Sequence, residues 1–403
     1  MLSSVTSIES TGLASNRGVS RFPGLRAAAV LAAIGSLTLT AAGQDVYDGA
    51  LGGDSNFETP GSWGGVYPGD DFGGNIIDIL SIFGTDPINV SNGITGIGGL
   101  TNSFDGDVVF GGTGSFTFNG GSTINPGAGS FTFEIDVFAD GSLTFDLTGD
   151  GAVQIDGNFT TNGGTILADG GFVEINGDTT SGEGTIWNAN DGGFNFNGVF
   201  NATGAQTFAG TSGTVADDVF TFDDVNFLTG AVDLATFDAA TANFNGTTTV
   251  AAGYGFSLDN AAVVTFNDFA AEGNHTVAFV DADSTFSVTG DASFIDTAIL
   301  TVTGDGNADF SGEVTLGQNF TASLTDADSE LTFRGETIFE TDTTLTVQGL
   351  GTFELDGTTE LPGPFTLLVN DDATVNWIAA TTVDGDFTIN TTGGAGNANV
   401  NFG

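Results

Sequence analysis

Eight aspartates recur near one position of a sequence repeat and are the strongest candidates for metal ligands in this chain. Each lies 13 to 16 residues after a recurring glycine position of that repeat; they are Asp259, Asp281, Asp283, Asp305, Asp326, Asp328, Asp371 and Asp372. Stacked parallel repeats would place such carboxylates in a column with a spacing of about 4.8 Å. Because Ca²⁺ accepts carboxylate oxygens in flexible geometry, we predict low-affinity Ca²⁺ binding along this column, and no required cofactor. The alternative is that these aspartates serve turn formation alone and are screened by salt.

Adjacent carboxylates offer a second kind of chemistry, the acid–base hydrolysis of a glycosidic bond. The pairs are Asp70-Asp71, Asp217-Asp218, Asp223-Asp224 and Asp371-Asp372. In a chain with 51 acidic residues, neighbouring carboxylates arise readily, so we expect these pairs to lie in solvated turns. We predict no catalytic and no cofactor-binding residue.

Positively chargeable side chains are scarce, which bears on the polysaccharide lyases and hydrolases built on parallel β-helices. Those enzymes use basic residues or histidine beside acidic ones, whereas here only His275 and Arg334 follow residue 43, almost three repeats apart. We expect His275 to be a polar surface residue. Arg334 should point outward and pair with Glu313 or Glu354 at a small energetic benefit.

The composition excludes several classes of protein. The formal net charge is -47, and a chain lacking residues 1–43 would carry 50 acids against one arginine, or -49. Nucleic acids and anionic membranes require clustered Lys and Arg, so neither is an expected partner. The absence of cysteine excludes disulfides and zinc–thiolate sites. A hydrophobic fraction of 39% with 37 Phe is too apolar for a disordered acidic tail.

The elements that position these residues are short strands repeated at a spacing of about 22 residues. A three-residue motif recurs, in which an apolar residue and any residue are followed by glycine. The glycine lies at positions 246, 290, 312, 335 and 357, and Asp268 and Ala379 occupy the same position of the motif. Successive copies are therefore 22, 22, 22, 23, 22 and 22 residues apart. A looser register runs upstream through Gly157, Gly177 and Gly198. A second apolar column follows in the segments 298–302, 320–324, 344–347 and 365–369. We expect the recurring glycine to adopt positive φ at a sharp turn.

Units of two or three short strands cannot bury their own apolar faces and must stack on copies of themselves. We therefore predict an all-β fold, a right-handed parallel β-helix with one repeat per coil and 13 or 14 coils. An antiparallel sandwich or barrel array is the alternative.

Three regions follow along the chain. Residues 1–43 combine a basic flank, a short apolar run and small residues before Gln44, which is typical of a cleaved signal peptide and predicts export. Residues 44–100 contain Trp63 and several prolines and are expected to cap the solenoid. Residues 101–403 form the repeats, which we expect to be incomplete at the C-terminus because 399–403 resemble the start of another coil. The mature chain should have no membrane span, and its oligomeric state is open.

The segment Trp63-Gly-Gly-Val-Tyr-Pro68, followed by Gly69-Asp-Asp-Phe72, resembles the opening motif of secreted bacterial proteins with autotransporter-associated β-strand repeats. The Gly-, Phe-, Thr- and Asn-rich coils are similar to autotransporter passenger regions. The resemblance implies a β-helical, secreted or surface-exposed product without a conserved catalytic centre. The chain departs from that pattern because no C-terminal barrel follows, which puts self-translocation in doubt.

Together these observations predict a secreted or cell-surface structural or adhesin-like protein that is not an enzyme. Its partners would be cell-surface or extracellular glycans or proteins. The competing hypothesis is a carbohydrate-binding or polysaccharide-degrading protein on the same scaffold. A groove lined by exposed Trp and Tyr beside two carboxylates would favour that hypothesis, whereas outer faces of Thr, Asn and Asp would favour the structural role.

Overall fold

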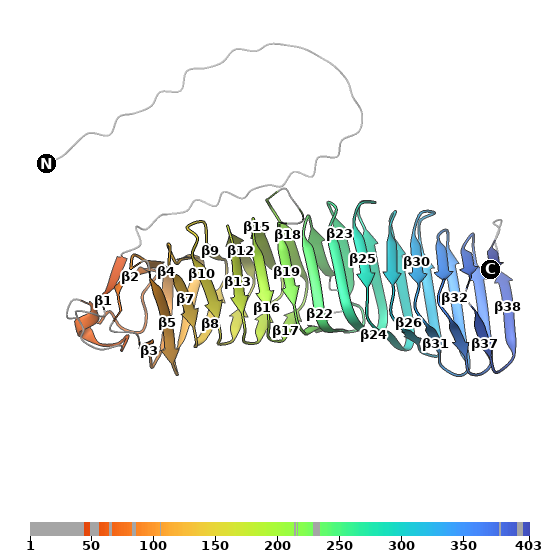
Figure 1. Ribbon diagram of the computed structural model, residues 1–403, viewed down its shortest axis with the longest axis horizontal. Coiled ribbons are helices and arrows are strands. Elements are labelled where there is room, and N and C mark those ends of the chain that lie inside the picture. Colours follow the sequence, from red (N-terminus) through yellow and green to blue (C-terminus); the bar gives the residue numbers. More distant parts are fainter. Residues whose placement is uncertain are drawn as a thin grey trace, which may run out of the picture. The chain divides into compact units, whose positions relative to one another are not determined.

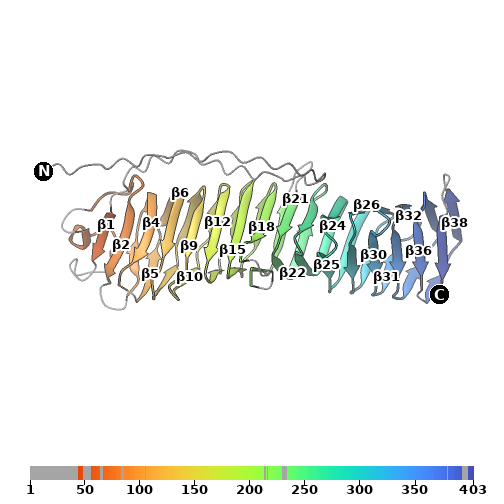
Figure 2. The ribbon, with the colours of Figure 1, turned by 90° about the horizontal axis from the view of Figure 1, so that it is seen from above.

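The computed structural model describes residues 44–403 apart from 49–55, 64–66, 83–85, 105, 213–214, 216, 229–233, 379 and 393–397. The described part is all-β, and about 14 coils with a spacing of about 22 residues stack into a parallel β-solenoid. Figure 1 shows the coils side by side along one axis, with β1 (Gln44–Asp48) at one end and β38 (Phe387–Thr392) at the other. The view turned by 90° in Figure 2 shows the same order. The predicted parallel β-helix is confirmed, whereas the signal peptide predicted at 1–43 lies outside the described residues.

Each regular coil contributes one strand to each of three faces, and each strand pairs in parallel with its equivalent one coil away. The first face contains β3 (Ile88–Val90), β5 (Asp107–Gly112), β7 (Ser130–Phe133), β10 (Ala152–Ile155), β13 (Phe172–Ile175), β16 (Gly193–Phe196), β19 (Val219–Phe222), β25 (Thr285–Val288), β27 (Asn307–Phe310), β30 (Glu330–Phe333), β33 (Thr352–Leu355), β36 (Thr374–Trp377) and β39 (Asn399–Phe402). The second face contains β8 (Asp136–Asp140), β11 (Phe159–Thr161), β14 (Thr179–Ser181), β17 (Phe200–Thr203), β20 (Val225–Leu228), β28 (Val314–Leu316), β31 (Thr337–Phe339), β34 (Thr359–Leu361) and β37 (Thr381–Val383).

The third face begins at β1 and ends at β38. Between them lie β2 (Ile76–Ser81), β9 (Leu143–Asp146), β12 (Gly164–Asp169), β15 (Thr185–Asn190), β18 (Gln206–Gly210), β21 (Leu234–Asp238), β23 (Gly255–Asp259), β29 (Asn319–Leu324), β32 (Thr343–Gly349) and β35 (Phe365–Asn370). Five longer strands bend around a corner and belong to two or three faces: β4 (Gly93–Asn102), β6 (Ser115–Asn125), β22 (Thr241–Val250), β24 (Val263–Phe279) and β26 (Ala292–Thr303).

The core is a set of apolar columns that follow from the alternation of the sequence. Along β35, for example, Phe365, Leu367 and Val369 are buried while the residues between them are half-buried. Phe222, Phe244 and Phe266 stack on one another, with ring centroids 4.6 Å and 4.4 Å apart and planes within 6° and 13°. Burying each such ring contributes about 1.5–3 kcal/mol, so the abundant Phe side chains supply much of the stability of the core.

The register predicted from the repeat motif is confirmed by the strand pairing. The first motif positions pair in the order Phe244, Phe266, Val288, Phe310, Phe333, Leu355 and Trp377. The looser upstream series also pairs, from Ile155 to Ile175 and on to Phe196. The next step, from Phe196 to Phe222, is longer because this coil carries an insertion between β18 and β19.

The explanation expected for the glycine column is wrong. None of Gly246, Gly290, Gly312, Gly335 and Gly357 has positive φ. Instead, a Cβ at Gly335 would overlap the carbonyl oxygen of Gly312, and a Cβ at Gly357 would overlap that of Gly335. Glycine is therefore required here because successive coils approach closely at this corner, and not because of the backbone conformation.

The stretch 44–100 contributes solenoid strands as well as an aromatic cluster. On the third face β1 pairs with β2, and β2 pairs with β4. A short 3-10 helix, η1 (Pro60–Trp63), brings Trp63 against Tyr47 and Phe57, with ring centroids 5.5 Å and 5.0 Å away. The Trp63 indole Nε1 donates to the carbonyl oxygen of Phe57 at 2.6 Å. These rings cover the first coils of the core, where Phe57 also packs on Phe116.

Candidate functional site

The predicted aspartate column lies at the corner between the third and first faces, and its best-defined members bind backbone amides. Asp281 accepts hydrogen bonds from the backbone N–H groups of Ala261, Asp283 and Ser284, each at 3.0 Å. Burial alone would raise the pKa of Asp281, but these bonds and one from the Ser284 hydroxyl hold it below its ordinary value. Asp326 accepts from the Gly304 N–H at 2.7 Å and from the Thr325 hydroxyl, which likewise lower its pKa. Both carboxylates therefore bind a backbone N–H group of the preceding coil.

The other predicted ligands occupy the same corner with varied surroundings. Asp259 accepts from the N–H of Asn260 at 2.9 Å, and Asp371 sits in a turn at φ 59°. The side chains of Asp283, Asp305, Asp328 and Asp372 are exposed. In the part of the chain that the structure describes, no three His, Asp or Glu side chains are grouped so that they could hold a metal ion. Calcium binding along this column stays a prediction, and the hydrogen bonds favour the turn-forming role for Asp281 and Asp326.

A second ladder of Asp and Asn, which sequence analysis missed, runs along the corner between the first and second faces. Asp136 Oδ1 accepts from the N–H of Asn158 at 3.0 Å, and Asn158 Oδ1 accepts from the N–H of Asp178 at 3.2 Å. Asp178 Oδ1 continues the ladder to the N–H of Val199 at 3.1 Å. The same contact recurs from Asp224 to Thr247, from Asp268 to Asp291 and from Asp291 to Glu313. For three of the six acceptors, Asn158, Asp178 and Asp291, the signal was an Asp or Asn directly after the repeat glycine, whereas Asp136, Asp224 and Asp268 follow other residues.

In the adjacent acidic pairs, Asp70, Asp71, Asp218 and Asp224 accept hydrogen bonds, and the expectation that these pairs lie in solvated turns is wrong for Asp218. Asp218 is fully buried, and its oxygens accept from the N–H of Asp191 and from the N–H and hydroxyl of Ser212, at 2.7–3.0 Å. Burial raises the pKa of Tyr67, and so does the hydrogen bond that its hydroxyl donates to Asp70 at 2.8 Å. Asp71 accepts from the N–H of Gly73, and Asp224 belongs to the second ladder described above. Asp371 and Asp372 occupy an exposed turn.

His275 is buried, which corrects the expectation of a surface residue. It is 2% exposed, and its ring nitrogens lie 3.0 Å from the carbonyl oxygens of Tyr254 and Glu272. Burial lowers the pKa of His275, and the two carbonyl groups, which favour the charged ring, oppose that shift only in part. A neutral imidazole donates from one nitrogen only, so one of the two carbonyl oxygens faces a ring lone pair.

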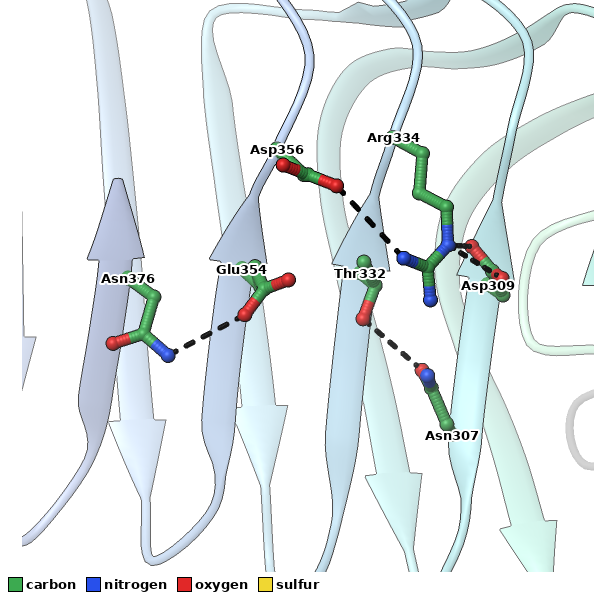
Figure 3. A network of polar contacts seen from close by, with 7 residues as sticks. All are labelled: Asn307, Asp309, Thr332, Arg334, Glu354, Asp356 and Asn376. Atoms are coloured by element: carbon green, nitrogen blue, oxygen red, sulfur yellow. Dashed lines mark hydrogen bonds and ion pairs between the residues drawn. The ribbon is translucent and has the colours of Figure 1, made fainter. Parts of the chain in front are cut away.

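Arg334 points outward as expected, but its partners differ from the predicted Glu313 and Glu354. Its Nε lies 2.9 Å and 2.8 Å from the two oxygens of Asp309 on the preceding coil, and Nη1 lies 3.9 Å from Asp356 on the following one. Figure 3 shows this network across four adjacent coils of the first face, with Asn376 donating to Glu354 at 3.4 Å. The Asp309 carboxylate raises the pKa of Arg334, which therefore stays charged.

Hollows on the described surface differ in chemistry. One of about 340 Å³ on the first face is lined by polar side chains that include Asp328, Glu330 and Asn376. A second, of about 280 Å³, lies beside the second face between Asp268 and Asp291. A third, of about 230 Å³, lies at the last coil and is mainly apolar, between Trp377 and Phe402.

Trp and Tyr side chains, which bind sugars in many proteins, are buried or half-buried in this chain. Trp187 and Trp377 are buried, and Trp63 is 9% exposed within the N-terminal cluster. Tyr47 and Tyr254 are also buried, and Tyr67 is half-buried. Tyr67 lies beside Asp70 and Glu58, and none of the hollows described above is lined by a Trp or Tyr ring together with two carboxylates.

Comparison with known proteins gives no relative: no family model, no curated protein and no solved structure matches the chain. Among the described residues no helix is long and apolar enough to span a membrane.

Proposed function

We propose that this chain is an exported structural or adhesive protein of the cell surface or extracellular matrix and that it has no catalytic activity. The observation that carries the proposal is the use of its acidic groups. Asp281 and Asp326, which were predicted as metal ligands, bind backbone amides of the preceding coil, and the ladder of Asp and Asn at the second corner makes the same kind of contact. The apolar columns and these ladders together build a long, rigid surface, which suits a scaffold.

The leader predicted at 1–43 and the resemblance to autotransporter-type passengers supply the cellular location in this proposal. Extracellular display also suits the strong negative charge, which keeps an elongated rod soluble.

Export can be tested by expressing the full chain in a bacterium, fractionating the cells and medium, and sequencing the N-terminus of the product. We expect the protein outside the cytoplasm with its N-terminus near Gln44. Leu31→Arg, placed in the apolar run of the leader, should retain it in the cytoplasm, whereas Ser3→Arg should not. An uncleaved protein in the cytoplasm would overturn the proposal.

A carbohydrate-active protein is the second candidate, and the hollow of about 340 Å³ beside the Arg334 network favours it. Asp328 and Glu330 line that hollow together with Asn376. Release of reducing ends from a neutral polysaccharide by the full chain, and its loss in Glu330→Gln, would support this candidate over the structural role.

A further inference from the structure

One part of the outer surface carries no charged side chain. It is the third face of the last six described coils, formed by residues 274–279 of β24, residues 297–303 of β26, and the strands β29, β32, β35 and β38. These segments contain no Asp, Glu, Lys or Arg, although the chain has 51 acidic residues. We call this surface the neutral face. Its outward side chains are Asn274, Thr276, Ala278, Thr297, Ile299, Thr301, Thr303, Asn319, Thr321, Ser323, Thr344, Thr346, Gln348, Thr366, Leu368, Asn370, Thr388, Asn390 and Thr392.

Acidic corners border the neutral face on both sides. Glu340, Asp342 and Asp384 precede its strands, and the predicted aspartate column follows them. The first face of the same coils, in contrast, carries Asp309 and Glu354. An anionic polymer approaching the neutral face would be repelled by both borders. An uncharged partner, however, could cover it without burying an unpaired charge.

The outward side chains form a regular array. Strand pairing places Thr297, Asn319, Thr344, Thr366 and Thr388 in one column and Thr321 beside Thr346 in the next. Neighbours lie about 4.8 Å apart along the solenoid, and adjacent columns lie about 6.6 Å apart along the strands. Threonine is stiff at χ1, and its hydroxyl both donates and accepts hydrogen bonds, so the array presents fixed polar groups.

Most of these polar groups are not used within the protein. Among the described residues, side-chain hydrogen bonds on this face join Gln348 to Ser323 and Thr392 to Asn370. The hydroxyls of Thr321, Thr344 and Thr346, at its centre, are left for water or for a ligand. The first face differs, because its outward groups bind one another in the network of Figure 3.

We propose that the neutral face binds the ordered surface of an uncharged, hydroxyl-rich polysaccharide. This inference rests on the proposed adhesive function and names its partner. None of the described hollows is lined by the outward side chains of this face. The rings of Phe320 and Phe365 are buried in the core, and Phe387 of β38 lines the apolar hollow at the last coil. A single sugar would therefore gain little binding free energy from this face. An extended, repeating polysaccharide surface would contact many hydroxyl groups of the face at once.

A second copy of the chain is a weaker candidate for this face. Six strands at about 4.8 Å and six residues at about 3.3 Å give a patch of about 29 Å by 20 Å, or roughly 600 Å². A stable protein–protein interface buries about 800 Å² on each partner. Pairing through the neutral face would also bring the acidic corners of two strongly negative rods together.

The test is binding of the full chain to insoluble cellulose and chitin, measured by depletion from solution at physiological ionic strength. Soluble cello-oligosaccharides, anionic pectin and ice serve as the comparison partners. T321E/T346E places two charges at the centre of the neutral face. T207E/T236E adds the same charge to paired, equally half-buried threonines on the third face outside the neutral face, and is the matched control. Circular dichroism confirms that each variant is folded, and T346E alone replaces the double variant if that one is not.

We expect wild type and T207E/T236E to bind cellulose or chitin with Kd values within about twofold of each other, and T321E/T346E to bind at least about tenfold more weakly. A tenfold loss corresponds to about 1.4 kcal/mol, a modest cost for covering an unpaired charge. Equal binding by both variants, binding to pectin alone, adsorption to ice instead of polysaccharide, or a dimer that T321E/T346E abolishes would each overturn the inference. Export without polysaccharide binding would refute this inference alone, whereas a cytoplasmic protein would refute the proposed function itself.

Discussion

Two buried threonines on the inner side of the second face provide the sharpest test of the energetics. Thr337 and Thr359 are paired across adjacent coils, are each 1% exposed, and have hydroxyl groups without a hydrogen-bond partner in the described structure. A buried polar group left unpaired costs about 1–3 kcal/mol. Valine has nearly the same shape and no hydroxyl, so T337V/T359V should increase the free energy of unfolding.

The expected gain is about 1 kcal/mol for each site. Because the two residues are in contact, the double variant need not reach the sum of the single ones. Thr185 is the matched control: it is equally buried, but its hydroxyl donates to the carbonyl oxygen of Gly182 at 2.8 Å. T185V removes a hydrogen bond and should lower stability by about 1 kcal/mol.

The assay is urea unfolding of the full chain, with amide hydrogen exchange of β31 and β34 as a local readout because long repeat arrays need not unfold as one unit. T337V/T359V should raise the unfolding midpoint and slow exchange in these strands, and T185V should lower the midpoint. If the double valine variant is destabilised like T185V, the threonine hydroxyls have partners and the reasoning fails.

Three further predictions concern the glycine column, His275 and the aspartate column. Gly335→Ala should cost about 1–3 kcal/mol in urea unfolding because its Cβ would overlap the Gly312 carbonyl, whereas Gly363→Ala, whose nearest neighbour would lie at 3.5 Å, should change stability by less than about 0.5 kcal/mol. Equal effects of the two substitutions would contradict the close-approach explanation. For His275, whose pKa is lowered from 6.5 in the folded state, the unfolded chain binds the proton more readily, so stability should fall as pH decreases below about 7 and recover as pH rises. His275→Gln should flatten that dependence between pH 7.5 and 5.5 at constant ionic strength, and an unchanged slope would refute the assignment. If the aspartate column binds Ca²⁺, millimolar Ca²⁺ should raise the melting temperature above that in chelator at matched ionic strength; no shift would reject cation binding.

Sequence alone was sufficient for the repeat and its register because parallel stacking forces equivalent residues to keep one spacing. Phe244, Phe266 and Val288 pair as their 22-residue steps predict. The step from Phe196 to Phe222 was not found, because an insertion at a corner lengthens a coil without disturbing the strands on either side. Periodicity therefore locates strands and is insensitive to what the turns contain.

The chemistry of individual side chains was harder to predict because it depends on contacts between coils. The motif around Gly335 indicated a turn but could not distinguish positive φ from close approach to Gly312. The outward direction of Arg334 followed from alternation, whereas its partner Asp309 depends on how strands from neighbouring coils align. His275 was misplaced because a polar residue beside Gly273 and Asn274 is typical of an exposed loop, yet β24 carries its side chain into the core.

The contact between Arg334 and Asp309 has a consequence for proteolysis. Residues 44–403 contain no lysine and only this arginine, and a trypsin-like protease must seat a free basic side chain in an acidic pocket. Here Asp309 already holds the guanidinium, and the residue directly follows a strand hydrogen-bonded to coils on both sides. Residues 44–403 thus offer trypsin-like proteases a single cleavage site, and its basic side chain is already bound to Asp309. A cut there would nick one turn between β30 and β31 and leave the remaining coils without a second site for digestion.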